Sequence, residues 1–405
     1  MHILFLTDNF PPEFNAPASR TYEHAKEWVN IGYDVTVITC VPNFPYGKVF
    51  TGYKNKLWQT ENIDGIRVIR VWSYIAANKG FFKRLIDFVS FALTSFFASF
   101  FIKNVDIVIG TSPQFFTAVS AYFVSVFKRC RFFFELRDLW PESIRVVGAM
   151  QSSRMLNLFE KLEIFLYQKA DCIVSVTESF KCNLKNRGIN PSKITVITNG
   201  VNTLNFKPMH RDQKLLNELG INGKFILGYI GTHGMAHNLQ TLLEAAYILQ
   251  ESSGADDIHF LFVGDGAEKE NLVNECTRKN LKNVSFLTPV ERNEVQRYLS
   301  ILDVAVVHLK KTDLFKTVIP SKIFECMGMG IPILHGVEGE SAEIITKNKV
   351  GLLFEPENSL DLVKKSLILK NDNKLMRELS HNGAVTAKMY DRKLLAHKMA
   401  SVFQS

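Results

Sequence analysis

The sequence predicts an α/β protein built from two doubly wound, Rossmann-like domains whose parallel sheets face a cleft. Short apolar or β-branched runs alternate with stretches of helical periodicity along nearly all 405 residues. These runs are almost continuously apolar, which is typical of parallel strands covered on both faces. The pattern starts again after the polar stretch 207–217. Two domains of similar size therefore fit the usual length of roughly 100–200 residues per domain.

The first domain is placed at residues 1–200 and should contain seven strands. Between most of them lie amphipathic stretches that predict helices, namely Thr21–Ile31, Phe116–Lys128 and Met155–Lys169. The strands expected here are Ile3–Thr7, Val35–Thr39, Ile66–Val71, Ile107–Gly110, Arg131–Leu136, Cys172–Val176 and Ile194–Ile197.

The second domain is placed at residues 201–385, and residues 386–405 form a final segment. A helix at Arg392–Phe403 is expected to pack back toward the first domain. The expected helices of the second domain are Leu239–Leu249, Glu268–Lys279, Arg292–Leu302 and Ser321–Met329. Its expected strands are Phe225–Ile230, Ile258–Val263, Val284–Leu287, Val304–Leu309, Pro332–Leu334 and Gly351–Phe354.

The uncharged segment 88–102 is Phe-rich and is flanked by Lys83, Arg84 and Lys103. Its 15 residues are too few to cross a bilayer, which takes roughly 17–25. Two interpretations stay open: a helix buried in the core, or a helix lying in the membrane interface with its basic neighbours reaching the headgroups.

Charge and aromatic content are unevenly distributed. Of the formal charge of +8, residues 1–205 carry +7, and they also contain 23 of the 32 Phe. A basic, Phe-rich first domain favours an acidic or membrane-surface partner, although a basic rim around an aromatic core would look the same. Nucleic acid is disfavoured because the Phe residues are not interleaved with Arg or Lys.

The cysteines and the start of the chain predict a cytoplasmic protein. The six Cys show neither a CxxC pair nor the spacing of metal ligands. The apolar start Met1–Thr7 lacks the basic residues and the length of a signal peptide.

Candidate binding residues lie in loops that follow strands, where open parallel sheets bind ligands. Gly231-Thr232-His233-Gly234 and Gly264 follow two strands of the second domain and allow close backbone approach. Further along, Ser321 is a good N-cap, and Lys322 and Glu325 are three residues apart, so they can face one ligand. A cation in a first helical turn suggests an anionic ligand, although an internal Lys–Glu pair is the alternative.

The segment Pro320-Ser321-Lys322-Ile323-Phe324-Glu325-Cys326-Met327-Gly328 resembles the donor-binding signature of the retaining family 4 glycosyltransferases with the GT-B fold. More narrowly, the chain resembles the bacterial O-antigen and capsule branch that includes the L-fucosamine (N-acetyl-L-fucosaminyl) transferases. The likeness also covers the ranges 5–13, 137–143, 196–201 and 228–234.

The resemblance implies that Glu325 binds the ribose of a nucleotide diphosphate sugar and that the 231–234 loop holds its diphosphate. Gly264, Thr288 and Pro289 would contact the base. This chain departs from the family where Thr317 replaces a Glu and where Thr232, His237 and Asn238 stand in place of two cations. We therefore expect Lys322 to carry the diphosphate charge.

The resemblance places the acceptor in the first domain. Arg137 and Asp138 follow a strand where relatives carry a His or Asp, and these two residues with Glu142 are the predicted catalytic groups; a structural salt bridge is the alternative for the Arg–Asp pair. Asn15 and Ala16 stand where the family often has paired glycines, and Arg20 is expected to reach a phosphate.

The resulting hypothesis is a retaining glycosyltransferase of lipopolysaccharide or capsule synthesis, peripheral to the inner face of the cytoplasmic membrane. It would move a sugar, N-acetyl-L-fucosamine by preference, from UDP to a glycan linked to a polyprenyl diphosphate, without a cofactor or metal. A UDP-sugar 2-epimerase of the same fold, a GDP-fucose-type fucosyltransferase and a non-catalytic relative are the alternatives.

Overall fold

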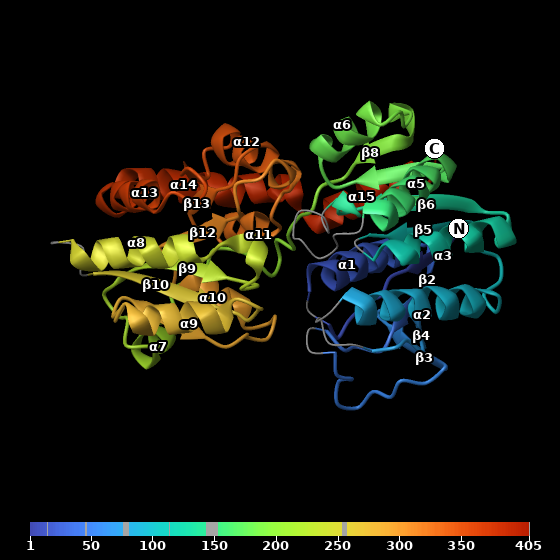
Figure 1. Cartoon of the computed structure of the whole chain (residues 1–405), viewed down its shortest axis with the longest axis horizontal. Coiled ribbons are helices and arrows are strands. Elements are labelled where there is room, and N and C mark those ends of the chain that lie inside the picture. The colour runs from blue at the N-terminus through green and yellow to red at the C-terminus, as the bar shows by residue number, and fades with distance from the viewer. Residues whose placement is uncertain are drawn as a thin grey trace. The chain divides into compact units, whose positions relative to one another are not determined.

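Two units of structure account for the chain in the computed structural model, which describes residues 1–13, 15–44, 47–75, 81–112, 114–142, 153–252 and 257–404. Unit 1 comprises Met1–Thr198 and Arg392–Ser405, and unit 2 comprises Asn199–Asp391 (Figure 1). The border thus lies at Thr198, close to the expected residue 200, and the chain returns to unit 1 at Arg392. No helix of the described ranges is long and apolar enough to cross a membrane.

Unit 1 contains an eight-stranded sheet in the order β3-β4-β2-β1-β5-β6-β7-β8. All neighbours pair in parallel except β3 and β4. Its strands are β1 (His2–Leu6), β2 (Asp34–Cys40), β3 (Trp58–Ile63), β4 (Ile66–Val71), β5 (Ile107–Thr111), β6 (Arg131–Leu136), β7 (Cys172–Ser175) and β8 (Ile194–Val196). Its helices are α1 (Ala16–Asn30), α2 (Phe81–Ser99), α3 (Phe115–Lys128), α5 (Ser153–Lys169), α6 (Glu178–Asn186) and α15 (Arg392–Val402).

The edge strand β3 is absent from the sequence-based assignment, which expected a purely parallel sheet. It pairs antiparallel with β4 through a turn at Asp64 and Gly65, both of which have positive φ. Its sequence, Trp-Gln-Thr-Glu-Asn-Ile, contains no apolar run because the strand lies at the partly exposed edge. The Asp-Gly pair is the sequence signal that predicts such a hairpin.

Helix α15 completes the core of unit 1, although it is separated from the rest by the whole of unit 2. Its residues Leu395, Ala396 and Met399 are buried with Phe403 against β1 and α1. The Trp28 indole donates a hydrogen bond to the Ala396 carbonyl at 3.0 Å, and its ring packs edge-on against Phe403 at 5.0 Å. The C-terminal helix is therefore an integral part of the first domain.

The segment 88–102 lies in and just after α2, and only one of its faces belongs to the core. Phe91, Ser95 and Ala98 are buried, whereas Leu93 and Phe97 are 55% and 57% exposed. The core interpretation therefore holds for the inner face of α2 alone.

Unit 2 contains a six-stranded, wholly parallel sheet in the order β11-β10-β9-β12-β13-β14. The predicted helix 292–302 is shorter than expected, and α7, α12, α13 and α14 were not predicted. The strands are β9 (Phe225–Ile230), β10 (Ile258–Val263), β11 (Val284–Leu287), β12 (Val304–His308), β13 (Ile333–Gly336) and β14 (Gly351–Leu353). The helices are α7 (Gln213–Glu218), α8 (Gln240–Glu251), α9 (Lys269–Arg278), α10 (Val295–Ser300), α11 (Lys322–Gly328), α12 (Glu340–Lys347), α13 (Ser359–Asn371) and α14 (Asn373–Ala387).

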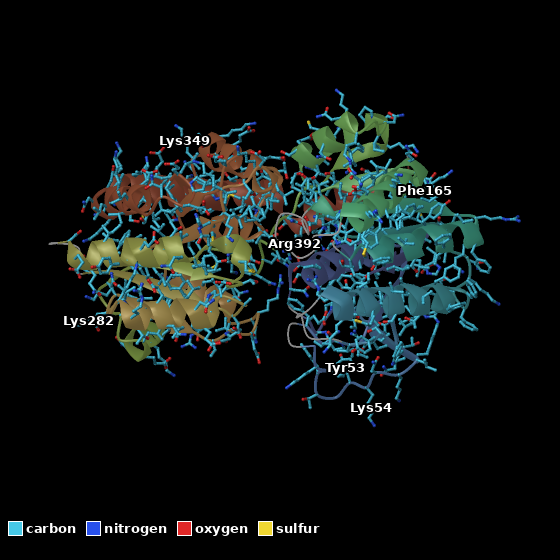
Figure 2. All side chains as sticks on the ribbon, in the orientation of Figure 1. Tyr53, Lys54, Phe165, Lys282, Lys349 and Arg392 are labelled. Atoms are coloured by element: carbon cyan, nitrogen blue, oxygen red, sulfur yellow. The ribbon has the colours of Figure 1, made fainter. Side chains whose placement is uncertain are left out.

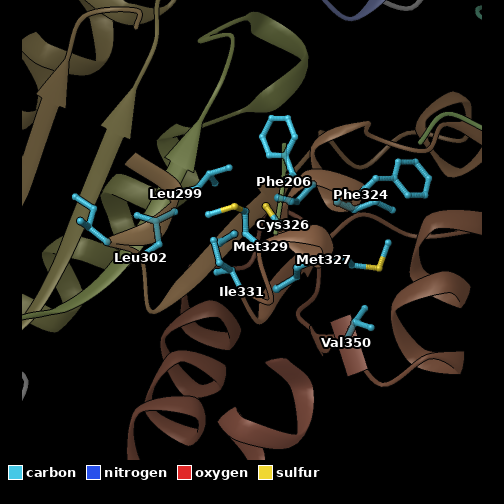
Figure 3. Close-up of a cluster of buried hydrophobic side chains, with 14 of the residues drawn as sticks. Phe206, Leu299, Leu302, Phe324, Cys326, Met327, Met329, Ile331 and Val350 are labelled. Atoms are coloured by element: carbon cyan, nitrogen blue, oxygen red, sulfur yellow. The ribbon is translucent and has the colours of Figure 1, made fainter. Parts of the chain in front are cut away.

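One buried cluster fixes α11 in unit 2. Phe324, Cys326 and Met327 of this helix pack with Phe206 and Leu299 (Figure 3). Because the apolar side of α11 is held in this way, the other side presents Lys322 and Glu325 toward the loop after β9 and the wall formed by α10.

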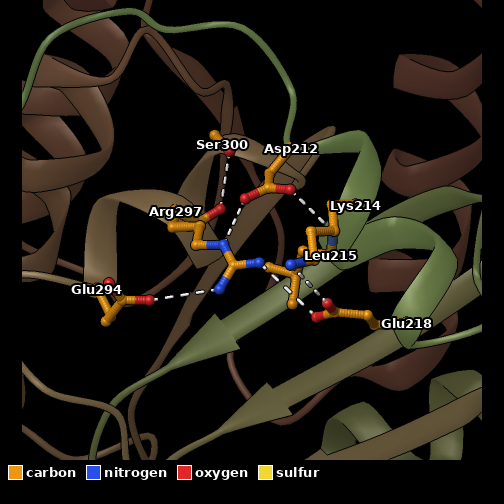
Figure 4. Close-up of polar contacts among 7 residues, drawn as sticks. All are labelled: Asp212, Lys214, Leu215, Glu218, Glu294, Arg297 and Ser300. Carbon is orange, nitrogen blue, oxygen red and sulfur yellow. Dashed lines mark hydrogen bonds and ion pairs between the residues drawn. The ribbon is translucent and has the colours of Figure 1, made fainter.

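Ion pairs hold α10 to α7 beside that wall. The Arg297 guanidinium pairs with Asp212 and lies 3.7 Å from a Glu218 carboxylate oxygen and 3.4 Å from one of Glu294 (Figure 4). The network is partly exposed, so each pair stabilises the fold only slightly, but together they orient α10.

Candidate active site

The loops after β9 and β10 pack backbone against backbone in unit 2. Gly231 donates its amide to the Val263 carbonyl at 2.9 Å, and His233 donates to the Asp265 carbonyl at 2.8 Å. Gly264 has φ +146°, and a Cβ there would lie 2.0 Å from the Gly231 carbonyl oxygen. Glycine at position 264 is therefore required by close packing of the two loops.

Lys322 lies against the loop after β9 without an ion pair in the described part of the chain. Its Nζ is buried, lies 3.7 Å from the centre of the Tyr229 ring, and has no hydrogen-bond partner among the described residues. A Cβ on Gly231 would come within 2.9 Å of this Nζ. Burial lowers the pKa of Lys322 to about 8, against the opposing effects of Cys326 and Glu325. A desolvated ammonium beside a glycine loop is a suitable site for an anion.

Glu325 lies one turn after Lys322 and is half-buried. Both side chains line a cavity of about 20 Å³, whose apolar wall includes Val295 and Leu299 of α10. The cavity is large enough for about one water molecule. The structure thus brings together Lys322, Glu325 and the Gly231 loop, as the sequence predicted, while Ser321 precedes α11 without capping it through its side chain.

His233 does not fit its predicted role as a ligand of the donor. Its side chain is fully buried and packs against Tyr229, Phe262 and Phe286, with ring centres 5.9–6.2 Å apart. Burial lowers the pKa of His233 to about 4, so the imidazole is neutral at pH 7. The amide of His233 is bonded to the Asp265 carbonyl and so ties the two loops together, while neither ring nitrogen has a hydrogen-bond partner among the described residues.

His237 likewise belongs to the scaffold of the loop. Burial, with a smaller contribution from Lys322, lowers its pKa to about 3. Its carbonyl accepts a hydrogen bond from Nδ1 of His308 at 2.8 Å, while Nε2 of His308 accepts from the Glu357 amide at 2.9 Å. This pair of bonds assigns the Nδ1–H tautomer to His308 and joins the end of β12 to the loops after β9 and β14.

The remaining donor-side residues lie at the same edge of the sheet. Thr288 and Pro289 are exposed directly after β11, next to the end of β10, and Thr232 is exposed at the tip of its loop. Lys269 was not predicted; its Nζ donates to the carbonyls of Gly264 and Leu287 at 2.7 and 2.9 Å. A lysine near the start of an amphipathic helix gives no sequence signal for this loop-tying role.

In unit 1, Arg20 is not available for a phosphate, which corrects the sequence-based expectation. The side chain is 3% exposed, and its Nε lies 2.8 Å from a carboxylate oxygen of Glu135. Its Nη atoms donate to the carbonyls of Thr198 and Ile197 at 2.7 and 3.1 Å. Arg20 is therefore a structural residue of the buried core.

Asn15 caps α1 by accepting a hydrogen bond from the Ala18 amide at 2.8 Å, and Ala16 is exposed at the first helical position. The side-chain amide of Asn15 also contacts the side chain of Asn9. Polar groups thus surround the start of this helix, where the family would have glycines.

Arg137 and Asp138 lie at the end of β6, and no ion pair joins them. The hydroxyl oxygen of Ser112, at the end of β5, accepts from the Arg137 amide at 2.8 Å and from the Asp138 amide at 3.2 Å. The end of β5 therefore fixes the backbone of both predicted catalytic residues. Glu142 is exposed in the same loop, and Ser143 lies outside the described residues.

Comparisons with known proteins divide the chain at nearly the same place as the two structural units. Residues 18–204 match the model "Glycosyltransferase Family 4", and residues 212–386 match "Glycosyl transferases group 1". The probable glycosyltransferase WbjE of Pseudomonas aeruginosa is 26% identical over 56% of this chain and 57% of its own length. A UDP-Gal:alpha-D-GlcNAc-diphosphoundecaprenol alpha-1,3-galactosyltransferase of Escherichia coli is 28% identical over 56% and 57%. The chain thus spans less than two thirds of the length of these curated relatives.

Solved structures share the whole fold. The sucrose-phosphate synthase of Thermosynechococcus elongatus matches with a TM-score of 0.77 at 16% identity, covering 100% of this chain and 98% of that one. Anabaena Alr3699/HepE in complex with UDP and glucose matches with a TM-score of 0.72 at 17% identity, covering 100% and 99%. The chain therefore has the GT-B fold.

Proposed function

Because the chain carries a Glycosyltransferase Family 4 domain followed by a Glycosyl transferases group 1 domain, we propose that it transfers a sugar from a nucleotide diphosphate to a lipid-linked glycan. The observation that carries this proposal is the buried Lys322 ammonium beside the glycine loop after β9, which has no hydrogen-bond partner in the part of the chain that the structure describes. A diphosphate bound there would neutralise its charge. UDP is the favoured nucleotide, since a solved neighbour is a UDP complex.

In this proposal unit 2 binds the donor and stabilises the leaving group. Negative charge develops on the diphosphate as the glycosidic bond breaks, and Lys322 stabilises that charge from a site of low dielectric constant. Glu325 accepts hydrogen bonds from the ribose hydroxyls. This scheme requires no metal ion and retains the anomeric configuration, as the resemblance implies.

For the donor sugar we propose N-acetyl-L-fucosamine. Thr317 stands where the family has a Glu, and its hydroxyl already donates to the Leu314 carbonyl at 2.6 Å. This position therefore offers no carboxylate to a sugar hydroxyl, which suits a deoxy sugar.

Unit 1 receives the acceptor, with Asp138 orienting its attacking hydroxyl. The relatives from Escherichia coli and Campylobacter jejuni are named for acceptors linked to diphosphoundecaprenol. We propose an acceptor of the same class, a glycan on a polyprenyl diphosphate, used in O-antigen or capsule synthesis.

The test is turnover with a panel of nucleotide sugars and an acceptor linked to undecaprenyl diphosphate, followed by mass spectrometry. Asp138→Asn should lower turnover by about a hundredfold or more, a loss typical of a misplaced reacting group, while UDP affinity stays unchanged. The exposed Asp34→Asn is the matched control.

Other outcomes select the alternatives. An epimer formed from a UDP-sugar without acceptor would indicate an isomerase, and consumption of GDP-fucose alone would indicate a fucosyltransferase. Full turnover of the Asp138 variant would remove this residue from the chemistry.

We further propose that unit 1 docks on the inner face of the cytoplasmic membrane through the outer side of α2 and α3. These helices pack side by side (Figure 1). Phe100 stacks on Phe127 with ring centres 4.3 Å apart. The exposed apolar side chains, called the α2–α3 patch, are Ile86, Val89, Leu93, Phe97, Phe100, Phe101, Phe123, Val126 and Phe127.

Charges around the α2–α3 patch suit an anionic surface. The exposed Lys83 and Arg84 lie near the start of α2, and the exposed Lys103 and Arg129 lie at the opposite end. Of the nearby acids, Asp106 accepts a hydrogen bond from the His2 amide of β1, and burial raises the pKa of Asp87 to about 7. Basic residues at both ends would reach lipid headgroups while the patch enters the interface.

Leu93→Asp combined with Phe97→Asp should reduce binding to phosphatidylglycerol vesicles by at least about tenfold, because two apolar contacts of 1–2 kcal/mol each are lost. Co-sedimentation with the vesicles measures the fraction of protein that is bound. Leu204→Asp with Leu360→Asp, at exposed positions in unit 2, is the matched control. Equal binding of both variants, or equal binding to neutral vesicles, would contradict the proposal.

A further inference from the structure

A second candidate site lies in unit 1, where the strand order reverses. Strands β1, β5 and β6 are adjacent in the sheet, whereas β2 continues from β1 in the opposite direction. Open α/β sheets bind ligands beyond the carboxyl ends of the strands at such a point. The groups at these ends are Asp8 after β1, Ser112 after β5 and Arg137 after β6.

Arg137 is the unusual member of this group. Its Nε and Nη1 are buried, and neither has a hydrogen-bond partner among the residues that the structure describes. Within the same residues it forms no ion pair, although its backbone is fixed by the Ser112 hydroxyl at 2.8 Å. The backbone of Arg137 is thus fixed, while two of its three guanidinium nitrogens have no hydrogen-bond partner among these residues.

Two carboxylates of this region form their ion pairs with other arginines. Of the neighbouring cations, Arg20 pairs with Glu135 at 2.8 Å, and Arg392, labelled in Figure 2, pairs with Glu23 at 2.7 Å. Each of these two acids is therefore already engaged with another arginine.

Two other titratable groups act on this cluster. Burial raises the pKa of Asp8 above its ordinary value, although hydrogen bonds and the charge of Arg137 act in the opposite direction. Burial, followed by the nearby arginines, lowers the pKa of His24 well below its ordinary value. Arg137 thus shares its neighbouring acids with other groups, and its Nε and Nη1 have no hydrogen-bond partner among the described residues.

A buried cation with unsatisfied donors is costly unless a ligand completes it. The planar guanidinium fork matches a phosphate group through two parallel hydrogen bonds. We propose that Arg137 binds phosphate oxygens in the diphosphate of the lipid-linked acceptor, an assignment that rests on the proposed function. The donor diphosphate has its own cation, Lys322, in unit 2.

The test is a calorimetric titration of UDP-saturated protein with farnesyl diphosphate, farnesyl monophosphate and farnesol. The diphosphate should bind more tightly than farnesol. Arg137→Gln should weaken diphosphate binding by about tenfold or more and leave farnesol unaffected, because only charge-assisted hydrogen bonds are lost. Arg137→Lys should retain part of the affinity, and the exposed Arg67→Gln should behave as the unmodified protein.

Thermal unfolding provides a second readout. Arg137→Gln removes unsatisfied buried donors but also a positive charge that favours the Glu135 carboxylate, so the midpoint serves to show that the variant is folded under the conditions of the titration. Undiminished diphosphate binding by the folded variant overturns the proposal. A matching loss of UDP affinity would instead assign Arg137 to the donor. None of these measurements needs sugar transfer, so failure of the proposed function would be seen separately.

Discussion

Lys322→Met is expected to weaken UDP binding by about ten- to a hundredfold. The variant keeps a long apolar side chain against Tyr229 but removes the charge that we assign to the diphosphate. Hydrogen bonds to charged groups contribute about 1.5–3 kcal/mol, and each 1.4 kcal/mol corresponds to a factor of ten. Isothermal titration calorimetry at pH 7 measures the difference.

The same lysine predicts a pH dependence. In the free protein its pKa is about 8, so the ammonium is mostly charged at pH 7 and mostly neutral at pH 9. A bound diphosphate favours the charged form, so binding above pH 8 requires uptake of a proton. UDP affinity should therefore fall by up to about tenfold per pH unit above pH 8. The Met variant should lack this slope.

Two controls distinguish phosphate recognition from general damage. Uridine, which lacks phosphates, should bind Lys322→Met and the unmodified protein equally. Lys282→Met, at an exposed position of unit 2 labelled in Figure 2, should leave UDP affinity unchanged. Undiminished UDP binding by the Lys322 variant would disprove the phosphate assignment.

Arg20→Met is expected to reduce the free energy of unfolding of unit 1 by about 3–5 kcal/mol, because it leaves the Glu135 carboxylate buried without its partner. Burial would raise the pKa of Glu135, but Arg20 and Arg137 outweigh it and lower the pKa on balance. All four Trp precede residue 141 and lie in unit 1, so tryptophan fluorescence during urea unfolding reports on this unit.

Adding Glu135→Gln to the Arg20 variant should restore part of the loss, since the orphaned charge disappears with its partner. Arg67→Met, an exposed change on β4, should stay within about 0.5 kcal/mol. A cost below about 1 kcal/mol for Arg20→Met would mean that the pair is solvated or dispensable.

The sequence predicted the buried sheets well, because parallel strands that are covered on both faces have continuously apolar sequences. The bounds of β6, β9, β10 and β11 coincide with the predicted ones. The edge strand β3 was not predicted because its sequence is polar. The outer side of α2 was not assigned because the sequence of an apolar helix does not show which of its side chains are buried and which are exposed.

The candidate site was predicted less evenly. Lys322, Glu325 and the Gly231 loop lie close together although they are far apart in the sequence. The strands that precede them, β12 and β9, are neighbours in the sheet and end at the same edge. The role of Arg20 was wrong because its partner Glu135 is 115 residues away, in β6. The direction of the His233 ring depends on packing by Phe262 and Phe286, which local sequence does not report.

Helix α15 also bears on the order in which the chain matures. Unit 2 is one contiguous segment, so a growing polypeptide holds all of it before residue 392 has been added. Unit 1 lacks Met399 and Phe403 until then, and its Trp28 has no Ala396 carbonyl to bind. Unit 1, whose synthesis begins first, is therefore completed last. Until α15 has been synthesised, the apolar side of α1 that it covers stays exposed to chaperones and proteases.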